Sequence, residues 1–96
     1  MLTSEQKRYL KSLSMTLLDK YQVGKNGITD NLVCMLDKAL TAKELIKIDV
    51  MKNLETPMNE LAFDLSSKLN ADIVQIVGRT ITLYRKNKEK PKIKLK

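Results

Sequence analysis

The alternation between helix-like and strand-like segments is the feature that most constrains how this chain can fold. Three segments repeat apolar residues at helical spacing: about 4–18, a segment beginning after Thr29, and about 57–69. Four shorter segments have the alternation or β-branched content of strands: 21–23, 45–51, 73–77 and 80–84. The order α-β-α-β-α-β-β predicts an α/β domain of the two-layer α+β kind, with helices packed on a four-stranded mixed sheet. Right-handed crossovers would make the first three strands parallel and the last antiparallel.

Residues that start and stop helices flank the helical segments. Thr3 and Gln6 have the spacing of a capping box, and Thr29 is a hydroxyl cap for the second helix. Thr56-Pro57 offers a cap followed by proline at the first helical position, where the missing N–H does no harm. Asn70 is expected to end the third helix in the left-handed conformation.

The last two strands are predicted to form a hairpin. Ile73–Val77 is β-branched almost throughout, which predicts a strand covered on most of both faces and central or nearly central in the sheet. Gly78-Arg79 fits a two-residue turn, which places Arg79 at the hairpin tip. The segment 45–51 instead alternates apolar and polar residues, so that strand should have one solvated face.

The composition excludes several classes of protein. The 96 residues include one cysteine, Cys34, and no histidine, so an internal disulfide is excluded and the usual metal ligand and general base are missing. We find no Ser-His or Cys-His pairing and no metal-ligand cluster, and expect no enzyme activity, cofactor, metal site or small-molecule substrate. No apolar run approaches the length of a membrane span, and residues 1–5 do not resemble a signal peptide. A cytoplasmic protein without membrane contact is expected.

Positive charge is concentrated at the two ends of the chain. The net charge is +7. Residues 1–25 contain five Lys/Arg and two acidic residues, and residues 86–96 contain six lysines and one glutamate. This distribution predicts one domain over residues 1–85 followed by a basic tail over residues 86–96. The excess charge suits either a well-solvated surface or a face that binds a polyanion.

Gly24-Lys25-Asn26-Gly27 is the candidate contact with a polyanion. Glycine at both ends permits positive φ and lets another chain approach with no Cβ in the way. A plain turn with a solvated lysine has the same composition, so these residues alone leave both interpretations open. The loop also lacks the Gly-Lys-Ser/Thr of nucleotide-binding loops. Lys7, Arg8 and Lys11 form a basic ridge on the first helix, which is equally compatible with an ordinary solvated helix face.

Four spaced motifs in order make the chain similar to the YhbY family. These are stand-alone bacterial CRM-domain proteins, named for chloroplast RNA splicing and ribosome maturation. The motifs are Leu2-Thr3…Gln6-Lys7-Arg8-Tyr9-Leu10, Val23-Gly24-Lys25-Asn26-Gly27-Ile28-Thr29, Glu44-Leu45-Ile46-Lys47 and Val77-Gly78-Arg79…Leu83-Tyr84-Arg85. The resemblance implies a fold similar to the C-terminal domain of bacterial translation initiation factor three, with the fourth strand between the second and third. Asn70 departs from the family, which often has glycine there.

The resemblance also implies a function. A bacterial member would bind RNA, associate with precursors of the large ribosomal subunit and assist ribosome assembly, with rRNA as its partner. The RNA-binding positions that it implies are Gly24, Lys25, Asn26, Gly27, Lys7, Arg8 and Lys11. We add Arg79 and Arg85 because of their charge and their position in the sequence. Because the four aromatic residues offer no clear platform for stacking bases, shape and phosphate readout by a monomer is expected. The alternative is a protein-interaction or anionic-surface-binding module that acts through the basic tail.

Overall fold

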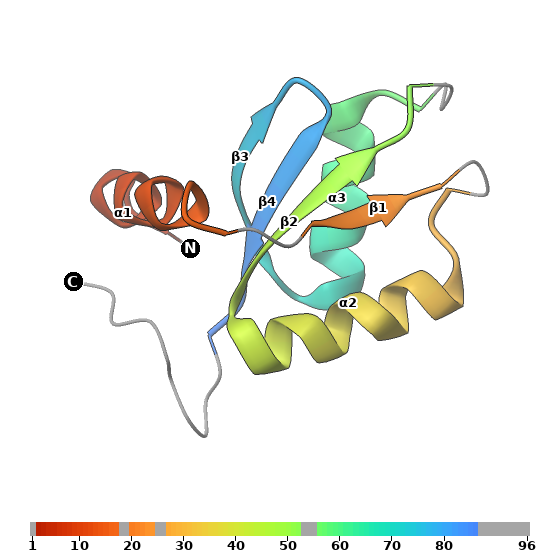
Figure 1. Cartoon of the computed structure of the whole chain (residues 1–96), viewed down its shortest axis with the longest axis horizontal. Helices are drawn as coiled ribbons and strands as arrows, with labels where there is room; N and C mark the ends of the chain where they lie inside the picture. Colours follow the sequence, from red (N-terminus) through yellow and green to blue (C-terminus); the bar gives the residue numbers. More distant parts are fainter. Residues whose placement is uncertain (1, 18–19, 25–26, 53–55, 87–96) are drawn as a thin grey trace.

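The computed structural model describes residues 2–17, 20–24, 27–52 and 56–86. The elements in these ranges are α1 (Ser4–Ser14), β1 (Tyr21–Val23), α2 (Asp30–Lys43), β2 (Leu45–Val50), α3 (Met58–Leu69), β3 (Asp72–Val77) and β4 (Thr80–Tyr84). Figure 1 shows them arranged as one sheet with helices on both of its sides. The predicted element order and the α/β class with a four-stranded mixed sheet are confirmed. The predicted two-layer arrangement does not hold, because α1 packs on the face of the sheet opposite to α2 and α3 (Figure 1). Of the predicted tail, 86–96, only Lys86 lies within the described residues.

The four strands form a single mixed sheet in the order β1-β2-β4-β3. β1 runs parallel to β2, whereas β4 is antiparallel to both of its neighbours, as predicted. β4 lies between β2 and β3, the arrangement that the family resemblance implied.

The prediction that residues 73–77 form a central strand was wrong, because β3 is an edge strand. Its β-branched composition reflects cover on its two faces. Ile73 and Ile76 pack on the core beneath α2 and α3, while Val74 is buried against α1 on the other face. A register shift between Ile73 and Gln75 accompanies this change of side. Burial of both faces of a strand therefore does not indicate whether other strands pair with it along both of its edges.

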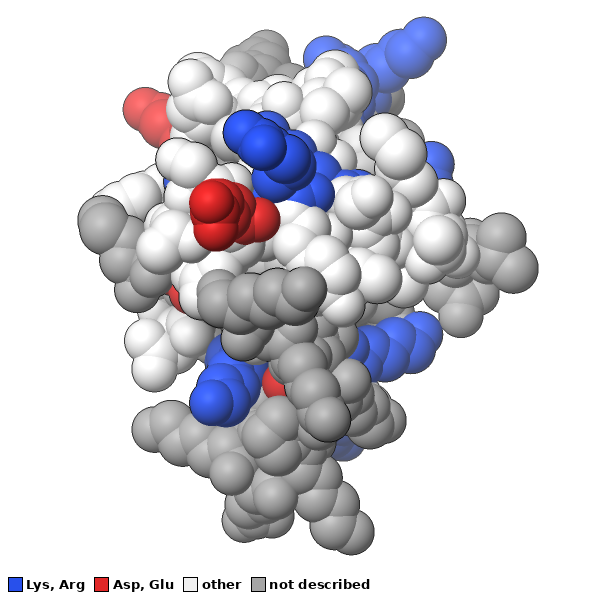
Figure 2. Space-filling view, turned by 90° about the vertical axis from the view of Figure 1, so that its left-hand side faces the viewer, with Lys and Arg blue, Asp and Glu red and all other residues white. Residues whose placement is uncertain are grey.

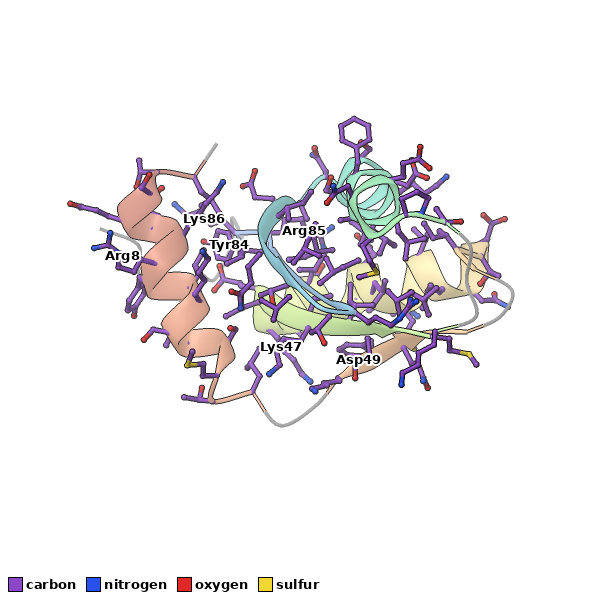
Figure 3. All side chains as sticks on the ribbon, turned by 90° about the horizontal axis from the view of Figure 1, so that it is seen from above. Arg8, Lys47, Asp49, Tyr84, Arg85 and Lys86 are labelled. Carbon is purple, nitrogen blue, oxygen red and sulfur yellow. The ribbon has the colours of Figure 1, made fainter. Side chains whose placement is uncertain are left out.

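The main core lies between one face of the sheet and the helices α2 and α3 (Figures 1 and 3). Ile46, Ile48 and Val50 of β2 point into it, as the alternation of that strand predicted. Ile81 and Leu83 of β4 join them from the centre of the sheet. This arrangement leaves Lys47 and Asp49 of β2 on the opposite face, where both are half-buried and project away from α2 and α3 (Figure 3).

α1 covers only one end of that opposite face. Leu10 of α1 is buried against three side chains, one from each of three strands: Leu45, Val74 and Tyr84. Among the described residues the hydroxyl of Tyr84 has no hydrogen-bond partner. Burial raises the pKa of Tyr84 above its usual value, and the negative charges of Glu44 and Asp72 raise it further. The rest of this face is the open face of the sheet.

The ends of α1 differ in how well the sequence anticipated them. The capping box is confirmed: Thr3 accepts a hydrogen bond from the Gln6 amide, and Gln6 accepts one from the Thr3 amide. The predicted end near residue 18 was wrong, because α1 ends at Ser14. The hydroxyl groups of Ser14 and Thr16 donate to main-chain carbonyls three residues earlier. The backbone amides of residues 15–17 also donate to carbonyls three residues earlier, so the chain forms tight turns in place of α-helix.

The predicted start of α3 was also off by one position. Pro57, with φ −58° and ψ 143°, is the residue that precedes the helix, so Thr56 does not cap it. The extended ψ of Pro57 keeps it out of the helix, although its carbonyl accepts the first helical hydrogen bond from Leu61. Asn70 ends α3 with φ 55° and ψ 45°, in the left-handed conformation that was predicted.

Candidate nucleic-acid interface

The glycine loop connects the end of β1 to the start of α2. The Gly27 amide donates to the Gly24 carbonyl at 2.9 Å, which holds the two glycines close together. Lys25 and Asn26, predicted as RNA contacts, lie outside the described residues. Thr29 caps α2 as predicted, since its hydroxyl accepts a hydrogen bond from the Leu32 amide at 3.1 Å. The two glycines therefore precede the helix and do not form part of it.

The fold requires glycine at only one of these two positions. Gly27 has φ +71°, a conformation that disfavours any side chain. Gly24 does not have positive φ, and the closest described atom to a Cβ there would be the Met51 sulfur at 4.0 Å, an ordinary contact. Neither backbone conformation nor described packing thus demands glycine at position 24. The absence of a side chain at this position leaves the backbone accessible from outside the protein.

The structure brings Arg79 to the same end of the sheet as the glycine loop. Arg79 follows Gly78, which has φ +57°, at the tip of the β3–β4 hairpin, as predicted. Its guanidinium donates to the Met51 carbonyl at 3.1 Å and to the Lys52 carbonyl at 3.0 Å. The Met51 amide in turn donates to the Val23 carbonyl at 3.2 Å. The hairpin tip, the exit of β2 and the exit of β1 are therefore tied together beside Gly24.

An open hollow of about 500 Å³ lies on the open face of the sheet at this same end. Its described lining consists of Lys20, Gln22, Asp49, Val50, Met51, Lys52, Arg79 and Thr80. Within it, the Thr80 hydroxyl donates to Asp49 at 2.7 Å, and the Lys20 ammonium lies 3.7 Å from the same carboxylate. Of these lining residues the sequence-based prediction named only Arg79. Strand alternation could have placed Gln22 and Asp49 on solvated faces, but their pairing depends on the register of β1 with β2.

The structure does not bring the basic ridge of α1 to the glycine loop. Lys7, Arg8 and Lys11 are exposed on α1 as predicted, and Arg8 points away from the sheet (Figure 3). Figure 1 places α1 at one end of the longest axis, and the exit of β1 with the start of α2 at the other. The molecule measures 38 Å along this axis. Seen from the α1 end, Lys and Arg side chains are scattered, with uncharged surface between them (Figure 2).

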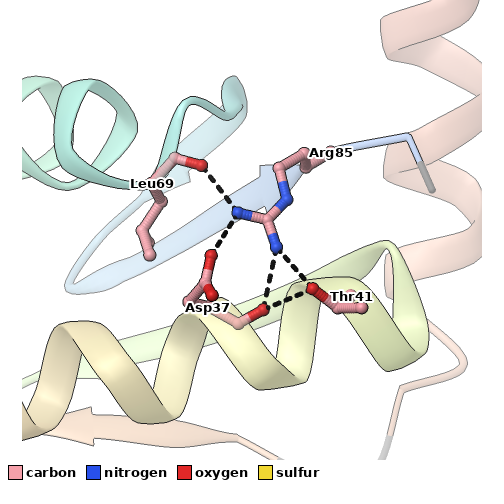
Figure 4. A network of polar contacts seen from close by, with 4 residues as sticks. All are labelled: Asp37, Thr41, Leu69 and Arg85. Atoms are coloured by element: carbon pink, nitrogen blue, oxygen red, sulfur yellow. Dashed lines mark hydrogen bonds and ion pairs between the residues drawn. The ribbon is translucent and has the colours of Figure 1, made fainter. Parts of the chain in front are cut away.

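Arg85 is engaged within the protein on the side of the sheet that α2 and α3 cover (Figure 4). One guanidinium nitrogen donates to the Asp37 carboxylate at 2.6 Å and to the Leu69 carbonyl at 2.8 Å. The other donates to the Asp37 carbonyl and to the Thr41 hydroxyl, both at 2.8 Å. These contacts join the end of β4 to α2 and to the end of α3. The structure therefore separates Arg85 from Arg79, the glycine loop and the ridge, so we leave it out of the candidate interface.

Three further findings concern the described residues. The described residues contain no group of three or more His, Cys, Asp or Glu side chains placed to hold a metal ion. In the same part of the chain, no helix is long and apolar enough to span a membrane. The described lining of the hollow contains no aromatic residue, so stacking of a base on a ring is not available there.

Comparison with known proteins supports an RNA-binding role. Residues 2–85 match the CRS1 / YhbY (CRM) domain family. The chain is 42% identical over 95 residues to "Probable RNA-binding protein YqeI" of Bacillus subtilis, covering 99% of each chain. It is 34% identical over 86 residues to "Probable RNA-binding protein PA4753" of Pseudomonas aeruginosa, covering 90% of this chain and 83% of that one.

A solved structure agrees with the fold. The solution structure of the hypothetical protein SAV1595 from Staphylococcus aureus matches with a TM-score of 0.82 and 41% identity, covering 100% of each chain. Because the family match and the relatives both extend over nearly the whole sequence, this chain belongs to the CRS1 / YhbY (CRM) domain family, whose members are RNA-binding proteins and not enzymes.

Proposed function

We propose that this CRM-domain protein associates with precursors of the large ribosomal subunit, assists their assembly, and contacts folded rRNA through its glycine loop and α1. The ribosomal assignment is supported by the sequence resemblance to stand-alone bacterial CRM-domain proteins. The contact surface is supported by the placement of Gly24 and of the exposed basic ridge.

Gly24 is the observation that carries the proposed loop contact. Its backbone is exposed, and no described feature of the fold requires the absence of a Cβ. An RNA backbone that packs against Gly24 would require that absence, because a methyl group would hold the phosphate away from the main-chain amides. Lys25, in the same loop, would add a direct charge contact with phosphate.

The separation of the loop from α1 favours a large, folded RNA as the partner. A ligand that touches both regions has to extend along the 38 Å axis of the molecule. A folded RNA presents phosphates at fixed positions over such a distance, whereas a short flexible strand would lose conformational entropy on being held at both ends. Lys7, Arg8 and Lys11 would then contact a second part of the same RNA.

Replacing Gly24 by alanine tests the loop contact without removing charge. We expect Gly24→Ala to change the free energy of unfolding by less than about 1 kcal/mol, since the added Cβ has room. RNA affinity should fall by roughly tenfold, the effect of about 1.4 kcal/mol. Urea unfolding and an RNA titration at fixed salt measure the two quantities. Unchanged affinity in a folded variant would show that the loop is only a turn.

Crosslinking in cells tests the ribosomal assignment. The tagged protein is crosslinked, purified under denaturing conditions, and the attached RNA positions are sequenced. We expect enrichment of large-subunit rRNA from assembly intermediates over mature ribosomes. Recovery of small-subunit rRNA, or of no rRNA, would contradict the proposal. The Gly24→Ala variant is the matched control, because its crosslinks should decrease at the positions that the loop contacts.

A further inference from the structure

The hollow on the open face of the sheet is next to the glycine loop. Met51 lines the hollow, its amide is hydrogen-bonded to the Val23 carbonyl, and its sulfur lies 4.0 Å from the position of a Gly24 Cβ. An RNA strand that contacts the glycine loop therefore has to cross only Met51 to reach the hollow. The basic ridge of α1, in contrast, lies at the far end of the molecule (Figure 1).

The charge of the hollow favours an anion. Lys20, Lys52 and Arg79 line it together with a single described carboxylate, that of Asp49. Asp49 is already engaged by the Thr80 hydroxyl and by Lys20, which leaves Lys52 and Arg79 without a carboxylate partner among the described residues.

Arg79 is held in place without being neutralised. Its two donors to the Met51 and Lys52 carbonyls fix the plane of the guanidinium, while carbonyl groups carry no net charge. Each terminal nitrogen of arginine carries two N–H groups, so donors remain for a ligand. A guanidinium with fixed orientation loses little conformational entropy when it binds phosphate, which makes it well suited to that task.

The remaining lining is suited to hydrogen bonding. Gln22 presents an amide with both donor and acceptor atoms, and Asp49 presents acceptor oxygens beside it, because the two residues pair in register on β1 and β2. These groups can bond to a ribose hydroxyl or to a base edge. The hollow is wide open to solvent, and its volume of about 500 Å³ is in the range of sites that take one small molecule.

We propose that this hollow binds one unpaired nucleotide of the RNA that the glycine loop holds. Arg79 and Lys52 contact its phosphate, and Gln22 and Asp49 face its sugar and base edge. This inference rests on the proposed RNA-binding function and extends it, because it directs the RNA strand from Gly24 across Met51 onto the open face of the sheet. The protein would thereby prefer folded RNA in which a paired region adjoins an unpaired residue.

The test uses the full chain and two labelled RNA hairpins that differ only in a short single-stranded 3′ overhang. Lys52→Ala and Gln22→Ala are the informative variants, because no described hydrogen bond involves either side chain and both residues are exposed. Lys38→Ala is the matched control, since Lys38 is an exposed lysine of α2 outside the described lining of the hollow. Binding is measured between 50 and 200 mM salt.

We expect the overhang to strengthen binding to the unmodified protein, and Lys52→Ala to reduce the log–log salt slope for the overhang RNA by about 0.7. Gln22→Ala should weaken binding of the overhang RNA several-fold without changing the slope, because it removes no charge. The blunt hairpin should bind all three variants as it binds the unmodified protein.

Three outcomes would overturn the proposal. They are an overhang that adds no affinity, a Lys38→Ala effect equal to that of Lys52→Ala, and competition by polyglutamate as effective as that by the overhang RNA. Gly24→Ala separates this failure from failure of the loop contact. If Gly24→Ala weakens both RNAs while the hollow variants behave normally, the hollow alone is excluded. If Gly24→Ala changes the affinity for neither RNA, the proposed loop contact is contradicted, whatever the hollow variants show.

Discussion

Replacing Leu65 by alanine is expected to lower the free energy of unfolding by about 2 to 5 kcal/mol. Leu65 lies in the middle of α3 with 0% of its surface exposed, packed in the core between the helices and the sheet. Its loss removes apolar contacts and leaves a cavity among side chains that the sheet holds in place. Domains of this size are stable by only about 5 to 15 kcal/mol, so a large part of the total would be lost.

Phe63→Ala is the matched control for Leu65→Ala. Phe63 lies on the same helix and is larger, but 65% of its surface is exposed. We expect its replacement to cost less than about 0.5 kcal/mol, the usual range for surface substitutions. Urea unfolding followed by circular dichroism measures both variants. Equal losses of stability at the two positions would contradict the structure, in which Leu65 lies on the buried side of α3 and Phe63 on the exposed side.

Arg85→Ala is expected to cost about 1 to 3 kcal/mol of folding stability, mainly because it leaves the partly buried Leu69 carbonyl without this donor. The Leu69 carbonyl is the critical one, since it is among the last of α3 and has no later turn of helix to bond it. The ion pair with Asp37 should contribute little, because 56% of the Asp37 side chain is exposed. The change is measured as a shift in the urea midpoint.

Two variants separate the carbonyl contacts of Arg85 from its charge. Arg85→Lys keeps the charge but cannot reproduce the planar fork, so most of the destabilisation should remain. Asp37→Ala removes the carboxylate and keeps the main-chain carbonyl, and should cost less than about 1 kcal/mol. If Arg85 contacted RNA instead, Arg85→Ala would reduce the salt slope of RNA binding. We expect that slope to be unchanged in the folded variant.

Local features of the fold were predictable from the sequence because they depend on neighbouring residues. The capping box of Thr3 and Gln6, the Thr29 cap and the left-handed Asn70 each involve groups within one helical turn. The end of α1 was missed for a related reason. The apolar spacing continues past Ser14, and Leu17 still packs beside α1, but hydroxyl groups bonding to the preceding turn end the helix first.

Features that depend on strand pairing could be predicted less well from the sequence. The β-branched run of β3 indicated cover on both faces, and the structure confirms that cover while placing the strand at an edge. Sequence periodicity describes the environment of side chains, which point out of a sheet. The partners of a strand are decided by hydrogen bonds within the sheet, and no periodicity of side chains records them.

The candidate interface divides in the same way. The glycine loop and the exposed ridge of α1 could be named from composition, because each is a contiguous segment with its own chemistry. Grouping them into one footprint requires their positions in space, and the structure sets them at opposite ends of the molecule (Figure 1). The sequence nominated both Arg79 and Arg85 as RNA contacts by their charge and position. Only their partners distinguish an arginine at the hairpin tip from one that ties β4 to α2 and α3.

The sequence by itself determined the element order, the class of fold, the family and the identity of the glycine loop, because periodicity, caps and short motifs are local properties of a chain. The tertiary structure alone decided that Arg85 is used internally and that Gln22 and Asp49 meet in a hollow beside Gly24. The contacts of Arg85 depend on how α2 and α3 pack beside the end of β4, and the hollow depends on the register between strands distant in sequence. Only the packed sheet and helices specify either one.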